Sequence, residues 1–69
     1  MTNIVYENLY LKMVETGVSF TLLSDTIGIK EEVFVEKMKG NIPFLLSEVI
    51  AICAYFKTSD VNFLFCTVI

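Results

Sequence analysis

The sequence predicts an all-α fold in which five short helices form a single domain over residues 1–69. Three kinds of observation support this expectation. Apolar residues recur at helical spacing, as at Val5, Leu9 and Met13. Glycines and a proline separate the segments, and residues that favour helix starts precede several of them. The length of 69 residues, with no repeat or internal linker, is that of one domain.

The first helix is expected to start after a cap at Thr2 or Asn3 and to run to about Thr16. Its apolar stripe would face the core. Ile4 and Leu11 fall near its polar side by helical angle, either as isolated apolar surface residues or as a contact patch.

The second helix is expected to begin at Phe20, because the Ser19 hydroxyl can accept a hydrogen bond from a free amide of the first turn. Gly28 is well suited to end it, since glycine adopts a positive φ without a Cβ clash. Its apolar face would consist of Leu22, Leu23 and Ile27.

A third helix should start at Ile29 or Lys30, with acidic residues in its first turn, where they suit the positive helix end. Phe34 and Met38 are four residues apart and would face inward, and Gly40 would end the helix. Residues 19–40 therefore predict two short helices joined by a tight turn, which is the pattern of a helix-turn-helix unit.

Pro43 lies in the loop that follows, and a fourth helix is expected over Leu45–Phe56. Ser47 and Glu48 are the polar residues of this segment, so we expect a helix that is apolar all round and buried at the centre. Ser59 would cap a short fifth helix over Asp60–Phe65.

The two cysteines, Cys53 and Cys66, both lie in apolar surroundings. Buried free thiols are the favoured interpretation, and a disulfide is the alternative. The apolar tail, residues 66–69, would lie exposed, fold over the core or pair with a second copy.

The composition narrows the classes of function. The chain has 55% apolar residues, no His, and no Gly-rich phosphate loop or nucleophile motif, so we expect neither an enzyme nor a cofactor. No metal-spaced ligand set is present. No signal peptide and no apolar run of about 18 residues occur, so we expect a cytoplasmic protein without a membrane span.

The unit 19–40 resembles the helix-turn-helix of the phage Cro and C1 repressors and related Xre-type regulators, with similar residues from about 5 to 65. The resemblance implies a compact, lambda-repressor-like domain. It also implies a small transcriptional regulator from a phage or mobile element, acting as a homodimer on a two-fold operator in double-stranded DNA. The fifth helix and the tail would form the dimer surface. The residues that carry the resemblance are Gly17–Ser19, Leu23, Ile27–Ile29, Phe34, Lys37–Gly40, Phe44, Leu46–Val49, Ser59–Val61 and Leu64–Phe65.

The resemblance also assigns candidate DNA-binding residues, and by helical angle several of them share the outward side of the third helix. A carboxylate there can accept from cytosine N4, but several carboxylates near phosphates oppose binding. The net charge of −3 and the lack of Arg act in the same direction. These candidates are Thr21, Lys30, Glu31, Glu32, Val35, Glu36, Lys39 and Asn41.

An alternative hypothesis keeps the fold and gives the same face to a protein partner. Phe20, Val35 and Ile42 would add apolar area around the former reading surface, inside a rim of acids. Such a module, a phage accessory or inhibitor protein, would not bind DNA. Phe44 can join this surface or belong to the core.

Overall fold

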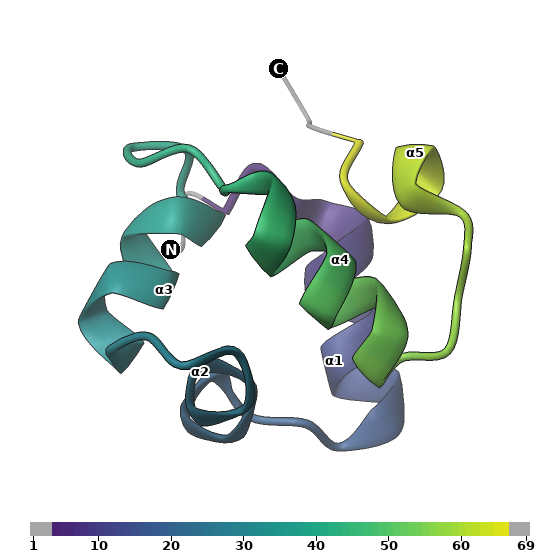
Figure 1. The fold of residues 1–69 in the computed structure, drawn as a ribbon, viewed down its shortest axis with the longest axis horizontal. Coiled ribbons are helices and arrows are strands. Elements are labelled where there is room, and N and C mark those ends of the chain that lie inside the picture. Colours follow the sequence, from purple (N-terminus) through teal and green to yellow (C-terminus); the bar gives the residue numbers. More distant parts are fainter. Residues whose placement is uncertain (1–3, 67–69) are drawn as a thin grey trace.

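Five α-helices and the turns between them make up residues 4–66, the part of the chain that the structure, a computed structural model, describes (Figure 1). The predicted all-α class is confirmed. In Figure 1, α2 points along the line of sight while α3 and α4 lie across it, so the helices cross at steep angles. The helices are α1 (Glu7–Thr16), α2 (Phe20–Ile27), α3 (Glu31–Met38), α4 (Leu46–Tyr55) and α5 (Val61–Leu64).

The α2–α3 connection forms as the local sequence predicts. The amide of Leu22 donates to the Ser19 hydroxyl at 3.0 Å, which caps α2. Gly28 has φ 78°, and the amide of Ile29 donates back to the Ser24 carbonyl at 3.0 Å, which closes the end of α2. Lys30 caps α3, so α3 begins at Glu31, slightly later than predicted.

The core takes side chains from all five helices, and Phe34 and Met38 of α3 are fully buried, as predicted. Phe44 packs edge-on against the rings of Tyr6 at 5.1 Å and Phe65 at 5.3 Å. Phe44 is therefore part of the core and not of an outer surface. The buried apolar residues are Leu9, Met13, Leu23, Phe34, Met38, Ile52, Cys53 and Leu64.

Two predicted helix starts and one predicted face are wrong. The α1 helix begins at Glu7, because the amide of Val5 donates to the Met38 carbonyl at 2.9 Å and ties the preceding segment to the end of α3. Asp60, not Ser59, caps α5, accepting from the amide of Phe63 at 3.2 Å. In α2, Leu22 is exposed while Leu23 is buried, since an eight-residue helix at the edge of the domain buries a narrow stripe. The candidate caps Thr2 and Asn3 lie outside the described residues.

The prediction that the fourth helix is buried all round is also wrong. Leu46 is 75% exposed and Ile50 is 59% exposed, and both lie on the side of α4 that faces away from the core. The polar residue Glu48 is buried instead, together with Ile52 and Cys53. A small domain can cover one face of a helix, and tertiary position selects that face regardless of how apolar the rest is.

The cysteines divide between the interior and the surface. Cys53 is buried, and burial raises the pKa of its thiol, which leaves it a small apolar group of the core. Cys66 is exposed, so the prediction of two buried thiols is half wrong. The remainder of the predicted tail, residues 67–69, lies outside the described residues.

Candidate functional site

The outward side of α3 forms a shallow hollow of about 320 Å³ lined by Glu31, Glu32, Val35 and Glu36. The inward residues Phe34 and Met38 hold α3 against the core, so the opposite side of the helix faces solvent. Lys30 and Lys39 cap the two ends of α3. The structure thus brings together six of the eight predicted DNA-binding residues on one helix and its caps.

Thr21 joins this face from α2. Its hydroxyl donates to Glu31 Oε1 at 2.7 Å, across the α2–α3 turn. The bond ties the first turns of the two helices together. The Thr21 hydroxyl would have to break its hydrogen bond to Glu31 before it could donate to a phosphate.

Asn41 and Lys39 both contact Glu36. The Asn41 side-chain amide donates to Glu36 Oε1 at 2.9 Å, and Lys39 Nζ lies 3.5 Å from Glu36 Oε2. The Asn41 hydrogen bond and the Lys39 charge hold the pKa of Glu36 below its ordinary value. Glu36 is therefore an ionised acceptor of hydrogen bonds from within the surface itself.

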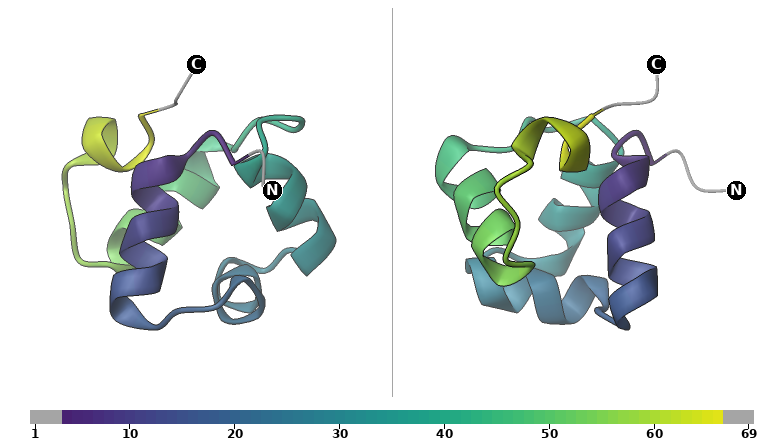
Figure 2. Two further views of the ribbon diagram at one scale, coloured as in Figure 1. Left: turned by 180° about the vertical axis from the view of Figure 1, so that it is seen from behind. Right: turned by 90° about the vertical axis from the view of Figure 1, so that its right-hand side faces the viewer.

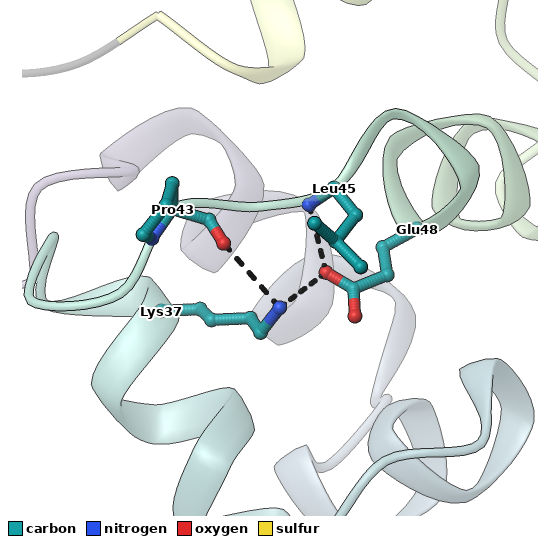
Figure 3. Close-up of polar contacts among 4 residues, drawn as sticks. All are labelled: Lys37, Pro43, Leu45 and Glu48. Carbon is teal, nitrogen blue, oxygen red and sulfur yellow. Dashed lines mark hydrogen bonds and ion pairs between the residues drawn. The ribbon is translucent and has the colours of Figure 1, made fainter.

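A buried ion pair lies behind this face, and it was not predicted from the sequence. Lys37 Nζ lies 2.5 Å from Glu48 Oε1, with side chains 6% and 9% exposed, and also donates to the Pro43 carbonyl at 3.3 Å (Figure 3). The Leu45 amide donates to the same Glu48 oxygen at 2.9 Å. The sequence contains a signal for this pair. Lys37 falls between Phe34 and Met38 on the inward side of α3, and Glu48 interrupts an apolar helix.

The environment of Glu48 contains opposing effects. Burial disfavours its charged form, but the hydrogen bonds from Lys37 and the Leu45 amide and the charge of Lys37 outweigh it. The pKa of Glu48 is consequently below its ordinary value. Lys37 is therefore committed to Glu48 and is not a group that can reach a phosphate on the surface.

The residues predicted for a protein partner come from α2, from α3 and from the loop that follows α3. Phe20 is half-buried, and its ring packs edge-on against Phe34 at 5.5 Å, so it belongs mainly to the border of the core. The inward Phe34 ring offers Phe20 a packing partner, and the rest of the Phe20 side chain stays at the surface. Val35 lines the hollow on α3, and Ile42 is exposed in the loop that follows.

Within residues 4–66, no group of three His, Cys, Asp or Glu side chains lies close enough to hold a metal ion. No helix of the described chain is both long and apolar enough to cross a membrane.

Comparison with known proteins gives no relative. No family model, no curated protein and no solved structure matches the chain.

Proposed function

We propose that this chain is a small DNA-binding regulator that inserts α3 into the major groove. The observation that carries the proposal is the α2–turn–α3 unit, in which α2 and the core hold α3 by its inward side. The outward side is left to solvent. This is the geometry in which a helix-turn-helix presents its second helix to base edges.

The lysines at the two ends of α3 support this orientation. Lys30 and Lys39 are nine residues apart. At 1.5 Å per residue they are separated by about 14 Å along the helix axis. The major groove is about 12 Å wide, so the two ammonium groups can reach phosphates on its opposite sides.

The acidic residues set the expected strength of binding. Glu36 is balanced by Lys39, whereas the net charge of the chain is −3. Non-specific affinity should be weak, because phosphate contacts supply most of it. A homodimer on two half-sites would compensate, and the exposed Val61 and Phe63 of α5, on the other side of the molecule from α3, provide an apolar surface for it (Figure 2).

The test is binding of the full chain to a fluorescent random duplex, measured by anisotropy at several salt concentrations. We expect binding at about 50 mM salt that weakens steeply as salt rises. Lys30→Ala and Lys39→Ala should each lower the slope of log K against log salt by about 1. Lys12→Ala, on α1, is the matched control and should leave the slope unchanged. Absence of binding at low salt would refute the proposal.

One observation favours a second candidate, a protein-interaction module. Three carboxylates surround Val35 in the hollow on α3, which suits the stem and charge of a basic side chain from a partner. In that case duplex DNA would fail to bind, and immobilised chain would retain a basic protein from a lysate. Glu32→Lys should abolish that retention, whereas Glu15→Lys on α1 should not.

A further inference from the structure

The outward residues of α3 differ in whether their polar groups are already used. Glu31 accepts a hydrogen bond from Thr21, and both oxygens of Glu36 accept from neighbours, Asn41 and Lys39. These carboxylates act as internal acceptors that hold side chains of the surface in place.

Glu32 differs from Glu31 and Glu36 in its hydrogen bonding. It is exposed, and its carboxylate accepts no hydrogen bond from any side chain or amide in residues 4–66. Val35 lies three residues further along α3 and lines the same hollow. Residues at this spacing are neighbours on a helix, with Cβ atoms about 5–6 Å apart. An unused acceptor and an apolar side chain therefore stand next to each other on the outward side.

The chemistry of a carboxylate limits what Glu32 can read. An ionised carboxylate accepts hydrogen bonds and donates none. Guanine presents two acceptors in the major groove and thymine presents one, so both repel it. Adenine has a donor beside the N7 acceptor, whereas cytosine presents its N4 donor without such a neighbour. Val35 fits the thymine C5-methyl group, which is the apolar feature of the groove.

We propose that Glu32 and Val35 determine the sequence specificity of the chain, with Glu32 accepting from N4 of a cytosine and Val35 contacting the methyl group of a nearby thymine. This inference rests on the proposed function. It ranks Glu31 and Glu36 behind Glu32 for base reading, because one oxygen of Glu31 and both oxygens of Glu36 already accept hydrogen bonds within the surface.

The experiment selects duplexes from a random library with the full-length chain and with two variants. The wild type should enrich a site with a fixed cytosine. Glu32→Gln should move the preference at that one position to adenine, because an amide pairs with adenine N6 and N7, and should weaken binding to the original site about tenfold. Glu31→Gln is the matched control and should select the wild-type site.

The Val35 contact has its own probe. Replacing single thymines of the selected site by deoxyuridine removes one methyl group at a time. At one position this should weaken wild-type binding severalfold, and Val35→Ala should bind the thymine and deoxyuridine duplexes alike.

The outcomes separate the two proposals. If the wild type binds no duplex even at low salt, the proposed function and this inference both fail. If it binds and enriches a site that Glu32→Gln also selects unchanged, the inference is overturned and the proposed function stands. Equal thermal unfolding of wild type and Glu32→Gln, expected for an exposed residue, shows that the change lies in recognition and not in folding.

Discussion

The two sides of α3 each carry a Lys–Glu pair, and the pairs differ in almost every physical respect. On the inward side, Lys37 and Glu48 are 2.5 Å apart with side chains 6% and 9% exposed. On the outward side, Lys39 and Glu36 are 3.5 Å apart with side chains 38% and 41% exposed. A buried pair is costly to break because the remaining charge has no water. An exposed pair contributes little, since water and salt replace the partner.

The comparison teaches that position, not residue type, sets the role of a charge here. The inward pair links α3 to the start of α4 and fixes the loop between them through the Pro43 carbonyl and the Leu45 amide (Figure 3). The outward pair holds Lys39 and Glu36 in an exposed contact, in which water or a binding partner can replace either side chain.

The largest expected effect is on stability, and it distinguishes Phe34 on the inward side of α3 from its neighbour Val35 on the outward side. Phe34→Ala should lower the free energy of unfolding by about 3–5 kcal/mol, because it removes a fully buried ring from the core. Val35→Ala, on the outward side, should cost much less. Urea unfolding followed by circular dichroism measures both. Phe34→Leu provides a folded variant if Phe34→Ala does not fold, and equal costs at 34 and 35 would contradict the assignment of sides.

Breaking the inward ion pair should have the next largest effect. Lys37→Met leaves Glu48 buried without a counter-charge, and should cost about 3 kcal/mol of unfolding free energy. Adding Glu48→Leu should recover much of this loss, because apolar residues often replace a buried pair at little cost. Lys39→Met is the matched control on the outward side and should change stability little. Additive single and double effects in a mutant cycle would refute the coupling of Lys37 with Glu48.

The smallest expected effect is on the pH dependence of stability. The pKa of Glu48 is lowered in the fold, so its stabilisation is complete above the unfolded-state pKa of about 4.3 and is lost as the pH falls through the folded value. Urea unfolding from pH 6 down to about pH 3 should therefore show falling stability. The Lys37→Met, Glu48→Leu double variant should show a shallower fall. An identical pH profile would mean that Glu48 does not contribute.

Much of the fold follows from local signals in the chain. Ser19 caps α2 through its own hydroxyl, and Gly28 ends α2 because a positive φ suits a residue without Cβ. Phe34 and Met38 are buried because helical spacing puts them on one side. The same spacing predicted that Glu32, Val35 and Glu36 share the outward side, where they line one hollow.

Other features depend on residues that are distant in sequence. The start of α1 depends on the hydrogen bond from the Val5 amide to the Met38 carbonyl, which helical spacing does not reveal. No local pattern reveals that the Phe34 ring lies beside Phe20. In the candidate site, the engagement of Thr21 with Glu31 depends on how α2 crosses α3, which the spacing of residues does not specify.

The sequence by itself determined the all-α class, the α2–turn–α3 unit and the outward side of α3, because caps, glycine conformation and helical periodicity act over a few residues. Only the tertiary structure decided which charged side chains form ion pairs or hydrogen bonds. It paired Lys37 with Glu48 in the interior, and it gave Glu31 and Glu36 hydrogen-bond donors from neighbouring segments. Glu32 received no such donor within residues 4–66. The physical reason is that desolvation and hydrogen-bond partnership depend on the surroundings a side chain meets after the helices pack, which no short stretch of sequence contains.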